Sequence, residues 1–148
     1  MSDTLWDYYN QELPDQQKAK LYNMTVMGMV KEFADVTGQI GTPELYEKLI
    51  EEEFEEWFAE EDNPKDELKE LSDLVYVAYG YAKARGWDLD EAIRRVHTNN
   101  LGRCTQPDGT VHRRADGKIM KNLDYPKVNL QDLVGNAAQE KHTFMTKA

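Results

Sequence analysis

Apolar side chains recur at intervals of three and four residues in four segments of the chain, which is the period of an amphipathic helix. The segments are residues 16–36, 43–62, 64–84 and 88–101. Capping residues agree with these limits, because Thr42 followed by Pro43 begins a helix and Gly86 ends one. The pattern therefore predicts an all-α fold built on four main helices.

The chain after the fourth predicted helix has no helical period. Two turn dipeptides, Asp108-Gly109 and Asp116-Gly117, flank short stretches typical of a hairpin or an ordered loop, and a short helix is predicted over residues 129–135. A length of 148 residues suits a single domain over residues 1–148. We expect an irregular N-terminal arm over about residues 1–15 and a flexible tail over about residues 136–148.

Charge is distributed unevenly along the chain. The formal net charge of −10 argues against binding to nucleic acid or to an anionic membrane surface, since both favour positive charge. Residues 44–73 contain 14 acidic and 3 basic side chains, whereas residues 94–127 contain 8 basic and 3 acidic ones. One part of the chain is thus suited to cations and another to anions.

The cysteine content and the hydropathy of the chain bear on its location. Cys104 has no second cysteine to pair with, which is typical of a reducing compartment. No signal peptide opens the sequence, and the longest apolar run, residues 74–82, is shorter than the roughly 20 residues that a membrane span needs. We expect a cytoplasmic protein with no membrane partner.

The run EEEFEEWFAEED, residues 51–62, places acidic side chains beside large aromatic ones. Projected at about 100° per residue, Glu53 falls inside the apolar stripe of its helix and Glu56 falls at the edge of that stripe, while Glu51 and Glu55 face away. A carboxylate directed into a helix interface is costly unless a neighbouring group compensates its charge. Glu53 and Glu56 therefore need a positive partner.

The next helix carries a second acidic pair, Glu70 and Asp73, beside its apolar stripe. Two pairs of carboxylates on consecutive helices form an all-oxygen ligand set, which suits Mg²⁺ or Mn²⁺, whereas zinc prefers His or Cys. The sequence has neither the Glu-x-x-His pairs of ferritin-like di-iron bundles nor the ligand spacing of an EF-hand. An acidic run is most often a solvated helix face, and the helical geometry alone leaves both interpretations open. Phe54 and Trp57 are expected to lie in the core.

Four motifs resemble those of a known superfamily. Residues 52–56 match Glu-Glu-x-x-Glu and residues 70–73 match Glu-x-x-Asp, a pairing similar to the all-α nucleoside triphosphate pyrophosphohydrolases of the MazG-like superfamily. The segment VHTNNLGR, residues 96–103, resembles the V-H-x-S-N-M-x-K segment of short bacterial and phage members. The segment DGKIMKNLDYP, residues 116–126, resembles their D-G-K-x-x-K segment followed by Tyr and Pro. The likeness covers roughly residues 30–126 and implies a MazG-like helical bundle with an irregular or hairpin-containing C-terminal segment.

The resemblance also implies which residues bind metal, and the basic segment that follows supplies candidates for substrate binding. It implies that Mg²⁺, or alternatively Mn²⁺, is bound by Glu53, Glu56, Glu70 and Asp73. It gives a catalytic role to Glu52 and Glu53, through a second ion or the attacking water. The candidates for substrate binding are Asn100, Arg103, Lys118, Lys121 and Tyr125. Asn99 stands where the family pattern has Ser, and Arg103 stands where it has Lys, which keeps the charge but changes the geometry of a phosphate contact.

The implied reaction is Mg²⁺-dependent hydrolysis of a nucleoside triphosphate to the monophosphate and pyrophosphate. We expect deoxynucleotides such as dGTP or dCTP as substrates, in control of the nucleotide pool. Two alternatives stay open: phosphoribosyl-ATP pyrophosphohydrolase, whose usual short form ends soon after the acidic helices, and a noncatalytic acidic adaptor for a basic partner. MazG-like proteins are typically dimers or dimers of dimers, and helices here carry apolar residues on more than one face, so a homodimer or homotetramer is expected.

Overall fold

The computed structural model describes residues 16, 20, 23–39, 41–60 and 62–135, and the predicted N-terminal arm and C-terminal tail lie outside them. This part of the chain contains the helices α3 (Val26–Thr37), α4 (Pro43–Ala59), α5 (Pro64–Arg85), α6 (Leu89–Arg103) and α7 (Gln131–Val134). The described residues form no strand, and their only β-type pairing is an isolated antiparallel bridge between Arg113 and Ile119. The prediction of an all-α fold with four main helices is confirmed.

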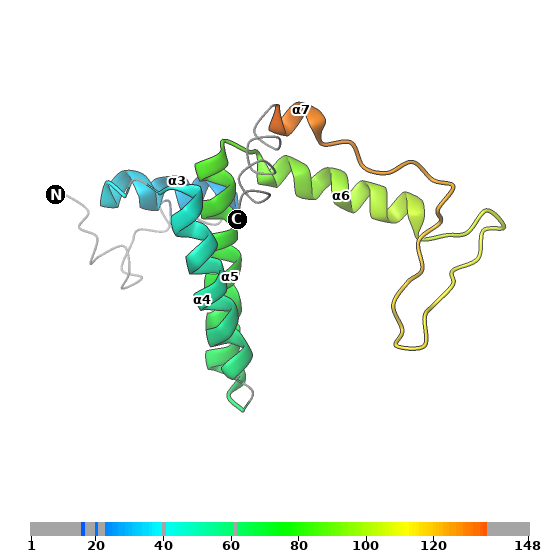
Figure 1. Ribbon diagram of the computed structural model, residues 1–148, viewed down its shortest axis with the longest axis horizontal. Coiled ribbons are helices and arrows are strands. Elements are labelled where there is room, and N and C mark those ends of the chain that lie inside the picture. Colours follow the sequence, from blue (N-terminus) through cyan, green and yellow to red (C-terminus); the bar gives the residue numbers. More distant parts are fainter. Residues whose placement is uncertain (1–15, 17–19, 21–22, 40, 61, 136–148) are drawn as a thin grey trace, which may run out of the picture.

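The antiparallel pair of α4 and α5 forms the centre of the molecule (Figure 1). Thr42 caps α4, because its hydroxyl oxygen accepts a hydrogen bond from the Leu45 amide at 3.2 Å. Asn63 caps α5, because its side-chain oxygen accepts from the amides of Lys65 and Asp66 at 3.2 and 3.3 Å. These caps fix where the helices begin and thereby which side chains of α4 meet those of α5.

Helix α3 crosses one end of α5 and forms a small core with it (Figure 1). Met27 and Val30 of α3 pack there against Tyr79 and Ala82 of α5. The predicted first helix, residues 16–36, is interrupted at residues 23–25, and most of its part before this break lies outside the described residues. The hydroxyl oxygen of Thr25 accepts a hydrogen bond from the backbone N–H of Gly28 at 3.0 Å and so caps a new helix, α3. The apolar spacing alone did not indicate this helix start.

The aromatic residues of α4 differ from the prediction in one respect. Trp57 is half-buried, but the side chain of Phe54 is 49% exposed and does not belong to the core. Phe54 instead contacts Trp57 and Phe58 along the surface of α4, with ring centroids 5.8 and 6.2 Å apart. The outer face of α4 is therefore apolar as well as acidic.

Tyr46 joins α4 to its neighbours by filling space that two glycines leave free. Its ring is buried and lies against both Gly41 and Gly80. A methyl group at Gly80 would lie 2.7 Å from Cδ1 and 2.8 Å from Cζ of this ring, well inside van der Waals contact. The close approach of α4 to α5 at this point thus requires glycine at position 80.

The substitution Gly80→Ala is expected to destabilise the protein, by about 1–3 kcal/mol as is usual for overpacked cores. Alanine is the better helix former by about 1 kcal/mol, but the clash with Tyr46 outweighs that gain. Urea unfolding followed by circular dichroism measures the effect. An unchanged or raised midpoint would contradict the proposed packing.

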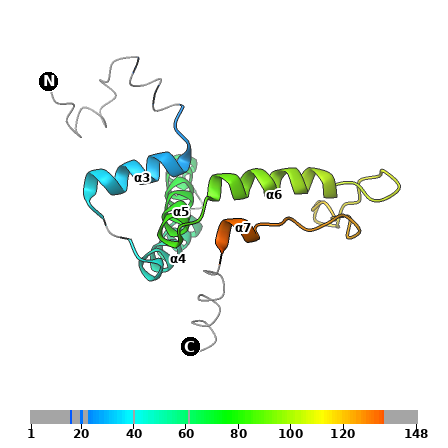
Figure 2. The same ribbon diagram turned by 90° about the horizontal axis from the view of Figure 1, so that it is seen from above.

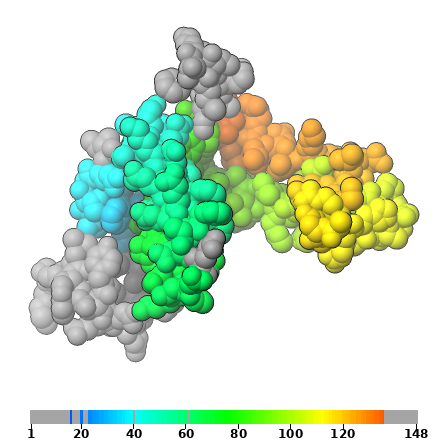
Figure 3. Space-filling model, turned by 60° about the horizontal axis from the view of Figure 1, so that its bottom comes forward, coloured from blue at the N-terminus to red at the C-terminus, as the bar shows by residue number. Residues whose placement is uncertain are grey.

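Helix α6 leaves the centre of the molecule and carries the following chain outward (Figure 2). It continues to Arg103, beyond its predicted end at residue 101. The chain then turns at Gly109 and Gly117, whose φ angles of 82° and 89° lie in the left-handed region that favours glycine, and returns along α6 to α7. In Figure 3 this outer part forms a lobe beside the one made by α4 and α5. We call residues 89–134 the α6 extension.

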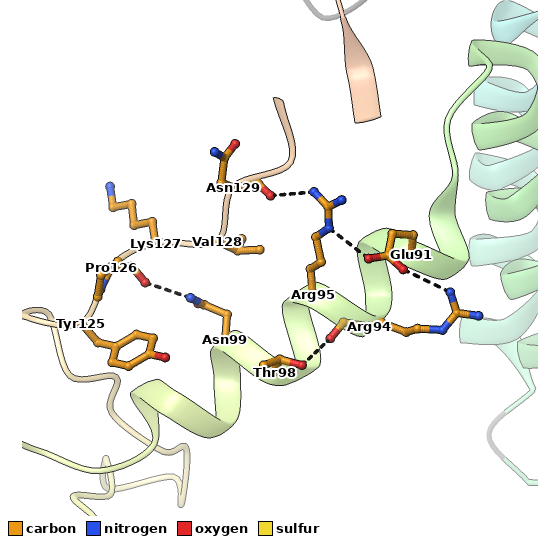
Figure 4. Close-up of a pocket in the computed structure, with 10 residues that line it drawn as sticks. All are labelled: Glu91, Arg94, Arg95, Thr98, Asn99, Tyr125, Pro126, Lys127, Val128 and Asn129. Carbon is orange, nitrogen blue, oxygen red and sulfur yellow. Dashed lines mark hydrogen bonds and ion pairs between the residues drawn. The ribbon is translucent and has the colours of Figure 1, made fainter. Parts of the chain in front are cut away.

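Contacts spaced along α6 hold the returning segment against the helix. The carbonyl oxygen of Arg103 accepts a hydrogen bond from the Asn122 amide at 2.8 Å. One turn earlier, Asn99 Nδ2 donates to the carbonyl oxygen of Pro126 at 2.8 Å (Figure 4). Asn99, which departs from the family pattern, therefore has a structural role in this chain.

Arg95 makes the third tie of the α6 extension. Its guanidinium group donates to both carboxylate oxygens of Asp132, at 2.6 and 2.9 Å, and to the Asn129 carbonyl oxygen at 3.3 Å. Glu91, one turn before Arg95, accepts from Nε at 3.1 Å and fixes the side chain from the other side (Figure 4). A bidentate ion pair between a guanidinium group and a carboxylate fixes the relative orientation of the two groups. Arg95 therefore fixes the position of α7 relative to α6.

No helix among the described residues is both long enough and apolar enough to cross a membrane.

Candidate metal centre

Three carboxylates from two helices meet in the α4–α5 pair. Glu53 projects from α4, and Glu70 and Asp73 project from the facing turn of α5. One oxygen of each lies within 4.8 Å of the others. All three side chains are half-buried, which is unusual for acidic residues on adjacent helices.

Two carboxylate oxygens of this group have no partner among the described residues. Glu53 Oε2 and Glu70 Oε2 are buried, and neither makes a hydrogen bond within the described part of the chain. An unpartnered buried carboxylate oxygen costs free energy, about 1–3 kcal/mol or more for a charged group. The three carboxylates therefore fit a bound cation, which is the kind of partner that such oxygens need.

The electrostatics of Glu53 agree with this geometry. Burial raises the pKa of the Glu53 carboxyl, and the negative charges of Asp73, Glu56 and Glu70 raise it further. Lys69 acts in the opposite direction but does not reverse the shift. Without a cation, the cluster thus holds more negative charge than its surroundings stabilise.

Lys69 is a part of the site that the sequence analysis missed. Its ammonium group lies 2.7 Å from Asp73 Oδ2 and 3.4 Å from Glu70 Oε1, and these hydrogen bonds raise the pKa of Lys69. The spacing of Lys69 and Asp73, four residues apart on α5, could have predicted this pair. Lys69 is 65% exposed and neutralises the outer side of the cluster, whereas the orphaned oxygens remain inside.

The other two predicted acidic residues of α4 stand at the margin of the cluster. Glu52 and Glu56 are both exposed, and neither belongs to the group of three whose oxygens converge. Glu56 contributes to the field at Glu53, since its charge raises the Glu53 pKa. Their assignment as a catalytic residue and a metal ligand stays a prediction.

A cavity of about 340 Å³ opens directly beside the cluster, between α3, α4 and α5. Glu53 and Asp73 form part of its wall. The other lining residues are Val30, Phe33, Gln39, Tyr46, Leu49, Tyr76, Val77 and Gly80. The site therefore combines a charged rim with an apolar and aromatic interior, an arrangement that is typical of small-molecule pockets.

The predicted substrate-binding residues lie elsewhere in the chain. Asn100, Arg103, Lys118, Lys121 and Tyr125 all belong to the α6 extension. Both ribbon views show this extension leading away from α4 and α5, which carry the carboxylates (Figures 1 and 2). Within one chain, the structure does not bring the predicted basic residues to the acidic cluster.

The structure gives particular environments to two of these five residues. Arg103 Nε is buried and has no hydrogen-bond partner among the described residues. The ring of Tyr125 packs against Gly102, where a methyl group would lie 2.8 Å from Cε1. Asn100, Lys118 and Lys121 are exposed. None of these environments tests substrate binding, so the assignment of all five stays a prediction.

Comparisons with known proteins show which proteins the part of the chain around the site resembles. The family of phosphoribosyl-ATP pyrophosphohydrolases matches residues 30–100, a range that includes the three carboxylates. Among solved structures, a MazG-like pyrophosphohydrolase from cyanophage S-2L, bound to dGDP and three catalytic Mn²⁺ ions per active site, aligns with a TM-score of 0.47. It is 20% identical, and the alignment covers 68% of this chain and 91% of that one. A search of curated proteins finds no match.

Proposed function

We propose that the chain is a nucleotide pyrophosphohydrolase with a MazG-like helical fold, and that it hydrolyses deoxynucleoside triphosphates with Mg²⁺ to the monophosphate and pyrophosphate. The observation that carries the proposal is the convergence of Glu53, Glu70 and Asp73 with two buried oxygens left unpartnered. This cluster lies within the matched residues 30–100. Control of the nucleotide pool, through substrates such as dGTP or dCTP, is the corresponding role.

The donor set favours a hard cation. Carboxylate oxygens alone converge here, as Mg²⁺ and Mn²⁺ prefer, and no described His or Cys joins them. Glu53, Glu70 and Asp73 would hold the ion, with Glu56 as the further proposed ligand. When bound, the metal supplies Lewis-acid stabilisation of phosphoryl oxygens and lowers the pKa of a bound water.

The remaining steps are proposed for side chains of the protein. Glu52 and Glu53 orient the attacking water and accept its proton, since a carboxylate beside the reacting phosphate can act as a general base. Arg103, Lys118 and Lys121 bind the β and γ phosphates, where positive charge stabilises the leaving pyrophosphate. Asn100 and Tyr125 complete the proposed contacts to the nucleotide.

A homo-oligomer would bring these two sets of residues together. The α4–α5 pair exposes Phe58 and Leu68 at 64% each, and α6 exposes Leu101 at 61%, so both parts have apolar surface that the described residues leave open. The acidic α4–α5 pair and the basic α6 extension are also complementary in charge. We therefore propose a homodimer, or a tetramer built from it, in which the α6 extension of one copy reaches the acidic cluster of the other.

Product analysis tests the reaction directly. The protein is incubated with Mg²⁺ and a panel of ribo- and deoxynucleoside triphosphates, together with phosphoribosyl-ATP. We expect monophosphate and pyrophosphate in equal amounts, because attack occurs at the α-phosphorus. Release of diphosphate and orthophosphate would contradict this point of attack. Turnover of phosphoribosyl-ATP alone would favour the activity for which the matching family is described.

A further inference from the structure

The cavity beside the carboxylates has the size and lining of a site for one part of a nucleotide. Its volume of about 340 Å³ lies at the lower end of the roughly 300–1,000 Å³ of ligand pockets. The walls include the aromatic rings of Phe33, Tyr46 and Tyr76, and no described basic side chain lines it. Such a surface suits a flat, mostly apolar group such as a nucleobase, and it does not suit a triphosphate.

The chemistry of the proposed reaction fixes where the nucleoside must lie. Water attacks the α-phosphorus, which is joined to the nucleoside through a single oxygen atom. The nucleoside must then occupy space directly next to the carboxylates. Two further cavities of the described chain, one beside Arg95 and Tyr125 and one beside Lys31 and Trp87, include none of the three carboxylates in their walls.

We propose that this cavity binds the nucleoside and that Gln39 contacts the edge of its base, an inference that rests on the proposed function. Gln39 supplies the only side-chain amide among the described residues of the wall, and that amide makes no hydrogen bond to a described residue. An amide offers a donor and an acceptor together, which matches the mixed edge of a nucleobase. Gln39 is therefore a specificity-determining residue.

The end of α3 holds Gln39 in the wall of the cavity. Gly38 adopts a left-handed conformation with φ of 64°, which ends the helix and turns the chain. The backbone N–H of Gln39 donates a hydrogen bond to Thr37 Oγ1 at 3.4 Å. The Thr37 hydroxyl in turn donates to the Phe33 carbonyl oxygen at 2.7 Å. The backbone of Gln39 is thus fixed by the helix end, and its side chain is left available for a ligand.

The test measures equilibrium binding of the four deoxynucleoside monophosphates, which does not require turnover. Val77→Phe places a ring into the cavity and is expected to weaken binding of every monophosphate by at least about tenfold. Val75→Phe is the matched control, because Val75 is 45% exposed on the same helix and does not line the cavity. Equal affinities for the two variants would overturn the proposal.

A second variant keeps the proposal testable if the phenylalanine at position 77 prevents folding. Gln39→Leu removes the amide with little change in size, so affinity for the preferred base is expected to fall about tenfold while the other bases change less. A Gln39→Leu protein that ranks the four bases as the wild type does would overturn the role of Gln39. If the wild type binds monophosphates in this manner but hydrolyses no triphosphate, the proposed reaction fails and the cavity assignment stands.

Discussion

Replacing Glu53 by Gln is expected to reduce Mg²⁺-dependent turnover by at least about 100-fold. Mutation of a residue that only hydrogen-bonds a metal ligand typically lowers metal affinity or activity by about 10–100-fold. Glu53 supplies one of the three converging carboxylates itself, so we expect a larger loss. The loss should appear with both Mg²⁺ and Mn²⁺, as measured by pyrophosphate release over a titration of each ion. Titration of the metal alone, followed by calorimetry, should show weaker binding.

The same substitution is expected to stabilise the metal-free protein at neutral pH. The pKa of Glu53 is raised above its ordinary value of 4.5, so ionisation of this carboxyl destabilises the folded state as the pH rises through the window between the two values. Thermal unfolding in a chelator should give a higher midpoint for Glu53→Gln at pH 7. The difference should shrink in acid, where Glu53 is protonated.

Glu55→Gln is the matched control for both measurements. Glu55 lies on the same helix, is exposed and does not belong to the cluster. We expect wild-type turnover and unchanged stability for this variant. If Glu53→Gln behaves in the same way, the metal centre is not at these carboxylates, and the chain's acidic face would be a solvated surface as in an adaptor protein.

A mixture of two inactive variants is expected to regain activity. Glu70→Gln removes a carboxylate from the acidic cluster, and Arg103→Ala removes a basic group from the α6 extension. If each site combines the cluster of one copy with the extension of another, a mixed dimer contains one site with neither change. Co-refolding the two variants in equal amounts should therefore restore about a quarter of the wild-type rate, since about half of the dimers are mixed.

The alternative arrangement gives a different result. Were cluster and extension to act within one chain, every site of a mixed dimer would carry one of the two changes, and the mixture would remain inactive. Sedimentation of the wild type provides the accompanying check, because the proposal requires at least a dimer. A monomer of 17.2 kDa with full activity would contradict it.

The parts of the fold that depend on local chemistry could be predicted from the sequence. The caps Thr42 and Asn63 and the glycine at position 86 define α4 and α5, since each acts through hydrogen bonds or backbone conformation within a few residues. The inward direction of Glu53 follows from the helical period alone. The caps and the period together are enough to predict that Glu53 faces the next helix and its acidic pair.

Features that depend on tertiary packing could not be predicted in this way. The helical period cannot show that α6 leaves the centre, because its direction is set by its few contacts with α3 and α5. The exposure of Phe54 could not be predicted either, since the helical period does not show whether an apolar side chain faces the core of its own chain or the surface. The cavity beside Glu53 depends on the position at which α3 crosses α5, and a local sequence pattern does not predict that position.

The position of Tyr46 restricts how this protein could evolve a new substrate preference. Its ring lines the cavity and also fills the space between α4 and Gly80, so a change there alters the pocket and the stability of the fold together. Gln39, which follows α3, also lines the cavity and is free of that coupling, because its side-chain amide makes no hydrogen bond to a described residue. We therefore expect substitutions that change the substrate preference, in natural variants and in designed libraries, to occur at Gln39, while Tyr46 and its glycine neighbours stay fixed.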